Sequence, residues 1–268
     1  MITVKTPAVV VGVDGSAAAL DAALWAIDEA EHRGVPLHLI YAVDPTDPDA
    51  QAQRLACART AVKDVANAVE STGRHVGIET SILQGRPVET LLRASRSALM
   101  LCVGARGLQH STHGRIGSTA AALSAGAQCP VAVVRSHRVH GRKRRSVIVE
   151  LPERCTAGLL LDRGLEEARR RNAPLRIVAT SPRTADTHTQ WERRLAESRR
   201  RYPQLDIRSV SCDSDALGYV AANADDVALM VTSRARRGGL TELLGAAGNA
   251  ALRDTDCSIL ICDPQTAL

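Results

Sequence analysis

Three glycines and two hydroxyl side chains are spaced so that they could bind a phosphate chain. Gly104 and Gly107 follow a run of apolar residues, and after nine intervening residues come Gly117, Ser118 and Thr119. Glycine lets main-chain N–H groups approach a ligand with no Cβ in the way. A helix that starts at Ser118 adds unpaired N–H groups and the positive end of its dipole. The spacing therefore predicts an anion site, to which both hydroxyls can add hydrogen bonds.

A carboxylate stands at a second position where a ligand could bind. Asp14 follows the first apolar run, residues 8–13, and precedes Gly15 and Ser16, which signal a turn and a helix start. If the sheet is doubly wound, the ends of its first and fourth strands flank the ligand crevice. An acidic side chain there can hold a base or a ribose hydroxyl. Neither a P-loop nor a G-x-G-x-x-G fingerprint occurs, and glycines that serve only turns remain the alternative.

The elements that must position these residues alternate between strand and helix. Strands are expected at residues 8–13, 37–43, 78–83, 98–103 and 131–134. Helices are expected at residues 17–33 and 88–96 and from about residue 118, with a long polar and helical stretch over residues 44–71. This alternation predicts an α/β fold with a doubly wound parallel sheet. The chain has no Phe, 2 Trp and 3 Tyr, so its core is aliphatic, as in parallel sheets between helices.

The second half of the chain repeats the first. Residues 34–39 match residues 172–177 at a shift of 138, and residues 101–103 match residues 229–231 at a shift of 128. The distal shift also places Gly117 on Gly245 and Cys129 on Cys257. We therefore predict a duplication, with the second copy shortened between its second and third strands. The expected domains are residues 1–135 and 146–268, joined by a basic linker over residues 136–145.

Composition limits the partners and the location that we expect. The net charge is +5, from 34 basic and 29 acidic residues, and the linker is either a basic strip for nucleic acid or membrane or a solvated connector. Few aromatic residues argue against single-stranded nucleic acid, which is bound by base stacking. No apolar run approaches the roughly 18 residues that a membrane span needs, and no signal peptide is evident. We expect a cytoplasmic protein with neither membrane nor nucleic acid as partner.

Cysteines and histidines suggest no metal or redox site. The seven cysteines include no C-x-x-C motif, which favours reduced and mostly buried thiols. His110 and His113 are spaced H-x-x-H in the loop before Gly117, but a metal site would need more ligands than this loop shows. We expect no protein-bound metal and identify no catalytic residue.

Four motifs together resemble one known family. Gly104-x2-Gly107-x9-Gly117-Ser118, Asp14-Gly15-Ser16, Gly85-x-Pro87 and Cys129-Pro130-Val131 resemble the universal stress protein family. The two-copy layout resembles its tandem members, which are common in actinobacteria. The resemblance implies two tandem Rossmann-like domains of the adenine nucleotide alpha hydrolase-like type. Each would be a five-stranded doubly wound parallel sheet flanked by helices, and many members bind ATP.

The resemblance also implies roles for individual residues and partners. Asp14 and Ala42 would contact adenine and ribose with Gly12 close by, and Val103 would lie against the base. The phosphates, with Mg²⁺ where it accompanies them, would be held by Gly104, Gly107, Gly117, Ser118 and Thr119. The family further implies that domains pair through their last strands, here residues 131–134 and 259–262, which would cover two edge strands. A homodimer of the tandem chain is left open.

The second copy departs from the phosphate-binding pattern. At a shift of 128, Thr232 replaces Gly104, Ala235 replaces Gly107 and Ala246 replaces Ser118; at a shift of 138, Pro152 replaces Asp14. Side chains at both loop glycines would obstruct a phosphate, so we predict that this copy binds ATP weakly or not at all. The three arginines of its loop could attract an anion or form a solvated basic loop; they are Arg234, Arg236 and Arg237.

Three functions remain open at the level of sequence. The first is an ATP-binding regulatory protein of the stress response with an unidentified protein partner, as the resemblance implies. The second is a slow ATPase, which would need a positioned water and charge stabilisation in the transition state. The third is an interaction scaffold that binds no nucleotide. The sequence shows binding elements but no identifiable base, so we rank the binding protein above the enzyme.

Overall fold

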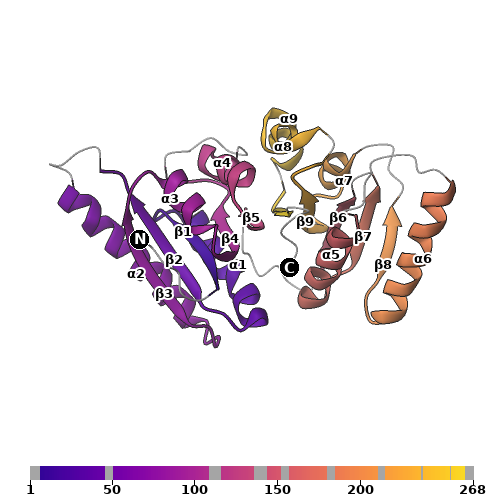
Figure 1. Cartoon of the computed structure of the whole chain (residues 1–268), viewed down its shortest axis with the longest axis horizontal. Helices are drawn as coiled ribbons and strands as arrows, with labels where there is room; N and C mark the ends of the chain where they lie inside the picture. The colour runs from indigo at the N-terminus through magenta and orange to yellow at the C-terminus, as the bar shows by residue number, and fades with distance from the viewer. Residues whose placement is uncertain are drawn as a thin grey trace. The chain divides into compact units, whose positions relative to one another are not determined.

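The structure is a computed structural model that falls into two units, residues 1–139 and 140–267 (Figure 1). It describes residues 7–45, 51–108, 116–135, 144–151, 157–179, 185–210, 215–236, 238–253 and 255–262. Most of the predicted linker, residues 136–143, lies outside this part of the chain. So do His110, His113, Arg115, Pro152 and Arg237.

The N-terminal unit is a five-stranded parallel sheet with helices on both faces. Its strands are β1 (Ala8–Val13), β2 (Leu37–Val43), β3 (Ile78–Gln84), β4 (Ala98–Gly104) and β5 (Val131–Val134). Its helices are α1 (Ala17–Arg33), α2 (Gln51–Ser71), α3 (Pro87–Ala94) and α4 (Ser118–Gly126). The strand order is β3-β2-β1-β4-β5, and α1 packs with α2 while α3 packs with α4 (Figure 1). The predicted doubly wound fold is confirmed.

Local signals in the sequence explain where the first helix begins and ends. The Ser16 hydroxyl accepts a hydrogen bond from the Ala19 amide at 3.1 Å and caps the start of α1. At the other end Gly34 adopts a left-handed conformation with φ of 63°, which glycine tolerates best. The alanine-rich face between these caps is buried on the sheet. These caps place the start of α1 beside the carboxyl ends of β1 and β4.

The C-terminal unit repeats the same architecture. Its strands are β6 (Ser146–Leu151), β7 (Leu175–Ala179), β8 (Ile207–Val210), β9 (Val227–Ser233) and β10 (Ser258–Cys262). Its helices are α5 (Ala157–Arg171), α6 (Ala185–Arg201), α7 (Ala216–Ala222), α8 (Gly239–Leu244) and α9 (Ala246–Leu252). The parallel strand order β8-β7-β6-β9-β10 is that of the first unit. The predicted pairing of the two last strands concerns the placement of the units, which is not determined, and stays a prediction.

Strand register corrects the predicted correspondence between the two copies. Val9 pairs with Met100, and its counterpart Val147 pairs with Leu229. The fourth strand of the second copy is therefore shifted by 129 residues, and the shift of 128 predicted for it was wrong. A backbone hydrogen bond just after the fourth strand supports the shift of 129. The Ala105 amide donates to the Val134 carbonyl, and in the second copy the Arg234 amide donates to the Cys262 carbonyl.

The corrected register changes the residues that face the second crevice. Ser233, and not Thr232, stands in the place of Gly104, and Arg236, and not Ala235, stands in the place of Gly107. The shift of 128 returns at the last helix, where the N-cap Gly245 matches Gly117. The second copy thus lacks nine residues between β7 and β8 and one more between β9 and α9.

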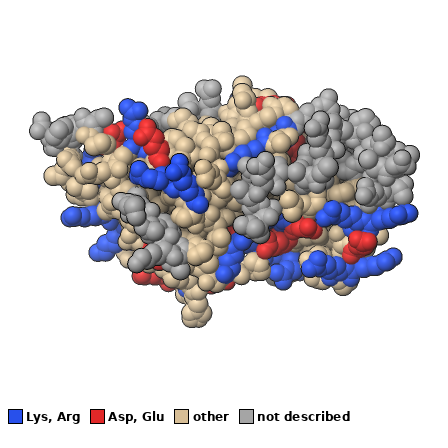
Figure 2. Space-filling model, in the orientation of Figure 1, with Lys and Arg blue, Asp and Glu red and all other residues tan. Residues whose placement is uncertain are grey.

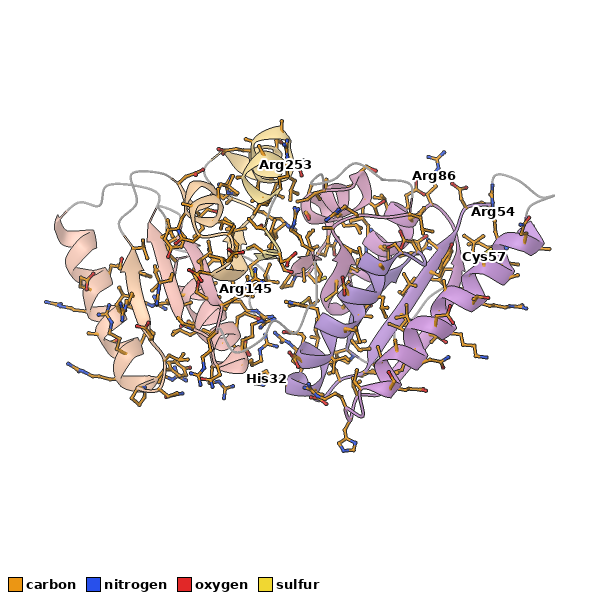
Figure 3. All side chains as sticks on the ribbon, turned by 180° about the vertical axis from the view of Figure 1, so that it is seen from behind. His32, Arg54, Cys57, Arg86, Arg145 and Arg253 are labelled. Carbon is orange, nitrogen blue, oxygen red and sulfur yellow. The ribbon has the colours of Figure 1, made fainter. Side chains whose placement is uncertain are left out.

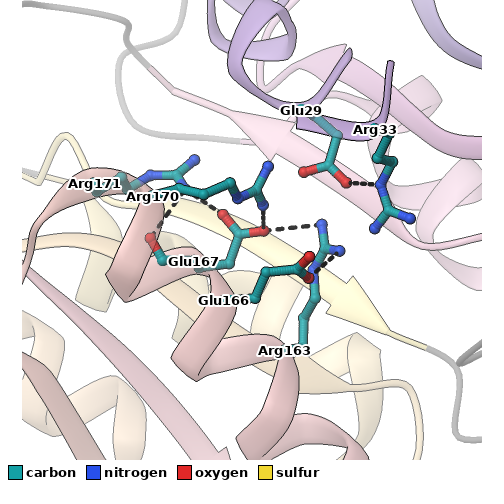
Figure 4. A network of polar contacts seen from close by, with 7 residues as sticks. All are labelled: Glu29, Arg33, Arg163, Glu166, Glu167, Arg170 and Arg171. Carbon is teal, nitrogen blue, oxygen red and sulfur yellow. Dashed lines mark hydrogen bonds and ion pairs between the residues drawn. The ribbon is translucent and has the colours of Figure 1, made fainter. Parts of the chain in front are cut away.

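An ion pair near the end of the first helix is repeated in both copies. Glu29 pairs with Arg33 on α1, and at the matching positions of α5 Glu167 pairs with Arg171 (Figure 4). A glutamate four residues before an arginine is the favourable order on a helix. In α5 the same carboxylate also accepts a bond from Arg163 at 2.9 Å. The repeated pair supports the duplication independently of the glycine motif.

Charge and apolar side chains are distributed as in an ordinary α/β protein. The buried cores consist mainly of Ala, Val, Leu and Ile from the sheet and the inner helix faces. On the face drawn in Figure 2, basic and acidic side chains are interspersed and form no single basic field. In the described part of the chain, no helix has both the length and the apolar character that crossing a bilayer requires.

Candidate functional site

A cavity of about 340 Å³ opens at the carboxyl ends of β1 and β4, where the strand order of the N-terminal sheet reverses. This volume lies within the range of small-molecule sites, roughly 300–1,000 Å³. The cavity brings together all nine residues that the sequence analysis proposed: Gly12, Asp14, Ala42, Val103, Gly104, Gly107, Gly117, Ser118 and Thr119. The position is the one at which doubly wound sheets bind ligands.

One part of the cavity lining, called the slot below, is apolar. The buried side chains of Ile40, Leu91 and Val103 line it, with Ala42 beside them. Gly12 forms its floor, because a Cβ there would lie 2.9 Å from Leu91 Cδ1 and 3.1 Å from Val103 Cγ1. A side chain at position 12 would therefore displace the walls of the slot. The slot suits a flat apolar group such as a nucleobase.

Another part of the cavity lining is the start of α4. Ser118, Thr119 and Ala120 line it, and their amides are the first three of the helix. Within the described residues these amides have no hydrogen-bond acceptor, as expected at a helix start. The Gly117 amide, in contrast, already donates to the Ala105 carbonyl at 2.8 Å. The first amides of α4 are therefore available to an anion here, whereas the Gly117 amide is already engaged.

Asp14 holds the glycine loop in addition to facing the cavity. Its Oδ1 accepts a hydrogen bond from the Ser16 amide at 2.9 Å, and its Oδ2 accepts one from the Leu108 amide at 3.3 Å. A Cβ on Gly107 would lie 2.7 Å from the same Oδ2. A side chain at position 107 would therefore displace the carboxylate of Asp14. Each carboxylate oxygen keeps a second lone pair, with which it can accept a bond from a ligand hydroxyl.

Gly104 is also glycine for a reason that the sequence did not show. A Cβ on Gly104 would lie 2.6 Å from the carbonyl carbon of Ala18 and 2.7 Å from its oxygen. The close approach of β4 to the start of α1 therefore excludes a side chain at this position. Gly117 differs, because a Cβ there would lie 3.7 Å from its nearest neighbour, the Ala105 oxygen. Protein atoms thus crowd a Cβ at Gly104 and Gly107 even without a ligand, and the role of these glycines in phosphate binding stays a prediction.

Tyr41 is a lining residue that the sequence analysis missed. Tyr41 reaches the cavity because β2 pairs with β1, where Tyr41 stands opposite Val13. Burial, and then the negative charge of Asp14, raise the pKa of the Tyr41 phenol above its ordinary value. Arg106, which flanks the predicted phosphate site in the sequence, also lines the cavity between the two loop glycines. Tyr41 directly precedes Ala42, a predicted site residue, and this position was a signal that could have identified it.

Three further side chains lie near the carboxyl ends of the strands of the N-terminal domain. Arg54 and Cys57 of α2 and Arg86 at the start of α3 point outward there (Figure 3). Arg86 directly precedes Pro87, which lines the cavity. Cys57 is exposed, whereas Cys102, Cys129, Cys257 and Cys262 are buried thiols outside any disulfide. Within the described residues, no three His, Cys, Asp or Glu side chains gather as a metal site would require.

The corresponding crevice of the C-terminal domain has different walls. Glu150 stands in the place of Gly12, Thr232 in the place of Val103 and Arg236 in the place of Gly107. Arg236 is buried with 5% of its surface exposed, so the solvated basic loop proposed from the sequence was wrong for this residue. Ala246 opens α9 where Ser118 opens α4, as predicted. The hydroxyl at the helix start is therefore absent from the second copy.

Comparisons with known proteins agree with this architecture. The family model described as "Universal stress protein family" matches residues 6–135. The chain is 41% identical over 272 residues to universal stress protein Rv2028c of Mycobacterium tuberculosis, covering 97% of this chain and 98% of that protein. It is 42% identical over 235 residues to universal stress protein Rv3134c of the same organism, covering 84% and 87%. Among solved structures, a universal stress protein of Archaeoglobus fulgidus superposes with a TM-score of 0.74 at 17% identity, covering 96% of each chain.

Proposed function

This chain belongs to the universal stress protein family, and from that premise we propose that its N-terminal domain binds ATP as a regulatory ligand. In this proposal the adenine enters the slot formed by Ile40, Leu91 and Val103. The ribose lies near Asp14, and the phosphates extend toward α4. The bound nucleotide then alters the affinity of the protein for a partner in the stress response.

The start of α4 is the observation that carries the proposal. Ser118, Thr119 and Ala120, the first residues of α4, line the same cavity as the apolar slot and bring helix amides and two hydroxyls to it. A helix start of this kind favours phosphate through its N–H groups and its dipole. A ligand that is apolar and flat at one end and anionic at the other matches both ends, and an adenine nucleotide has this form.

The composition of the cavity supports binding more than hydrolysis. Among the described residues that line it, Asp14 is the sole carboxylate, and it already accepts bonds from the Ser16 and Leu108 amides. Hydrolysis of a γ-phosphate requires a group that orients the attacking water. We therefore place a slow ATPase activity second and a scaffold without nucleotide third.

Further expectations follow from this proposal and from the family. Mg²⁺ would bind mainly through the phosphates, because it is usually held by phosphate oxygens, water and one or two carboxylates. We propose a cytoplasmic location, where the nucleotide is abundant. We also propose that the two domains pair through β5 and β10, and that the chain forms homodimers if an edge remains free.

Calorimetric titration with ATP, ADP, AMP and cyclic AMP tests the proposal. We expect about one equivalent of ATP per chain, with an affinity that falls roughly tenfold or more in Gly117→Ala because the new methyl group enters the phosphate end. Gly117→Ala is preferable to Gly107→Ala, since the Asp14 carboxylate would clash with a Cβ at position 107. Arg253→Gln, at an exposed position of the C-terminal domain, serves as the control.

The alternatives are separated by two further measurements. Phosphate release that disappears in Gly117→Ala would establish the ATPase. A purified protein that holds no nucleotide and shows no heat of binding would establish the scaffold and end the proposal. Two equivalents of ATP per chain would show that the C-terminal crevice binds as well.

A further inference from the structure

The C-terminal crevice contains a buried carboxylate where the N-terminal crevice has its glycine floor. Glu150 lies on β6 in the place of Gly12, and its side chain is 2% exposed. Two wall residues are smaller or more polar than their counterparts, since Val220 replaces Leu91 and Thr232 replaces Val103. The side chain of Glu150 therefore points into space that the slot occupies in the first copy.

An arginine from the equivalent of the glycine loop meets this carboxylate. Arg236 Nε donates to Glu150 Oε2 at 2.9 Å, and Nη2 donates to Oε1 at 2.9 Å. The Thr232 hydroxyl donates to the same Oε2 at 2.5 Å. Both charged side chains are 2% exposed, so the contact is a buried bidentate pair. This geometry is the strongest that an arginine and a carboxylate form.

The remaining donors of the guanidinium hold the segment that follows the loop. Arg236 Nη1 donates to the Gly239 carbonyl at 3.1 Å and to Glu242 Oε2 at 3.2 Å. Asp215, the N-cap of α7, lies 3.9 Å from Nη2. One side chain thus joins the strand floor, the start of α8 and the start of α7. In the first copy the matching space between the equivalent elements is the open cavity.

The charges of this cluster compensate one another. Burial alone would lower the pKa of Arg236, but the hydrogen bonds and charge of Glu150, with Glu242, outweigh burial and raise it. The guanidinium stays protonated at every pH at which the domain is folded. A buried cation is retained only where carboxylates pair with it, as they do here.

We propose that Arg236 is a built-in occupant of the C-terminal crevice, held by Glu150, that fixes the segment 238–245 without any ligand. The guanidinium fills the position at which the first copy leaves a cavity, and the segment is closed in the presence and in the absence of nucleotide. This inference concerns the C-terminal domain and does not depend on ATP binding to the N-terminal domain.

Hydrogen–deuterium exchange of the full-length chain tests the assignment peptide by peptide. In Arg236→Gln we expect amide exchange in residues 238–245 to accelerate by about tenfold or more, because the segment loses its anchor and Glu150 is left buried and unpaired. Glu150→Gln should accelerate the same peptide. Arg236→Lys, which keeps the charge but not the bidentate geometry, should give a smaller increase. Arg253→Gln, exposed at the end of α9 (Figure 3), is the matched control and should change nothing.

Two outcomes would overturn the proposal. One is unchanged exchange of residues 238–245 in both Arg236→Gln and Glu150→Gln. The other is a wild-type chain in which saturating ATP slows exchange of residues 238–245, since a filled crevice has no room for the ligand. If Arg236→Gln fails to fold, Arg236→Lys and the wild-type chain with and without ATP still decide the question. Failure of ATP to bind the N-terminal domain would leave the result for Arg236 unaffected.

Discussion

The two domains of this chain share one backbone plan and differ in what occupies the same crevice. Strand order, the pairing of the central strands and the glycine before the last helix are common to both. In the first domain the crevice is a cavity lined by helix amides that have no acceptor among the described residues. In the second domain Glu150 and Arg236 fill it with a buried ion pair. The backbone therefore provides a crevice, and a few side chains decide whether a ligand can enter it.

The difference shows how a duplicated site can change without a change of fold. The buried pair joins two opposite charges, so each residue compensates for the burial of the other. Without Arg236, Glu150 would be a buried carboxylate with no cation beside it; without Glu150, Arg236 would keep only the more exposed Glu242 and Asp215. The predictions below test this comparison from the largest expected effect to the smallest.

Removing the Glu150 carboxylate should destabilise the C-terminal domain but not the N-terminal domain. In Glu150→Ala we expect the C-terminal domain to lose about 3–5 kcal/mol of unfolding free energy, because the buried Arg236 loses its bidentate partner and keeps only the more exposed Glu242 and Asp215. Trp25 lies in the first domain and Trp191 in the second, so Trp25→Phe makes fluorescence a reporter of the C-terminal domain in urea. Glu197→Ala, exposed on α6, should change stability by less than about 0.5 kcal/mol. Equal losses in both variants would contradict the buried pair.

ATP should stabilise the first domain alone. At a free concentration of about 100 times Kd, a ligand that binds only the folded state adds about 2.7 kcal/mol. With Trp191→Phe, the fluorescence of Trp25 should report this increase in urea unfolding. With Trp25→Phe, the Trp191 transition should stay where it is. Equal shifts of both transitions would show that both crevices bind, or that the domains unfold as one unit.

The two helix-start glycines should respond in opposite ways to alanine. In Gly245→Ala the new Cβ would lie 2.1 Å from the Thr241 carbonyl oxygen, so we expect a loss of about 1–3 kcal/mol in the C-terminal domain. In Gly117→Ala the nearest atom would be 3.7 Å away. The N-terminal domain should keep its stability and lose ATP affinity. Urea unfolding measures the stability of both variants, and calorimetry measures their ATP affinity. A loss of stability in Gly117→Ala would contradict the prediction.

Mild acid should weaken the first domain more than the second, with the smallest effect of the four. His38 Nε2 lies 2.8 Å from the Ser81 hydroxyl, and burial lowers the pKa of His38 below its ordinary value of about 6.5. The neutral ring therefore contributes stability above about pH 6.5 that is lost as the pH falls.

The matching position of the second domain does not titrate in this range. Arg176 stands in the place of His38 and pairs with Asp206 at 2.8 Å. Burial alone would raise the pKa of Asp206, but the hydrogen bonds of Arg176 and Arg208 outweigh it and hold that pKa below its ordinary value. Urea midpoints of the two single-tryptophan chains between about pH 7.5 and about pH 5 should diverge. His38→Gln should remove the divergence, and its persistence in that variant would refute the assignment.

Elements and their order could be predicted from the sequence because their signals are local. The caps Ser16 and Gly34, the apolar runs and the repeat led to both domains, and the glycine motif with the family resemblance led to nine of the residues that line the cavity. The reasons for individual glycines could not be predicted, because they depend on atoms distant in the sequence. Ala18 excludes a side chain at Gly104, and Asp14 excludes one at Gly107.

The position of the second shortening was equally hidden. The apolar residues of β4 align with those of β9 almost equally well at shifts of 128 and 129. The one-residue difference before α9 could therefore not be detected in the sequence. The shifted register concealed the counterpart of Gly107, which is Arg236. Charge pairing between Glu150 and Arg236 joins residues 86 positions apart, a distance at which periodicity gives no information.

The contact between Gly104 and the backbone of Ala18 has a consequence for reading motifs in related genomes. Where the backbone of a neighbouring helix leaves no room for a side chain, selection retains the glycine as long as the helix starts at the same place. A lineage that ceased to use the nucleotide would gain nothing by replacing it and would lose stability if it did. Part of the glycine motif can therefore persist after nucleotide binding is lost. Counting motif glycines then overestimates how many related proteins still bind a nucleotide.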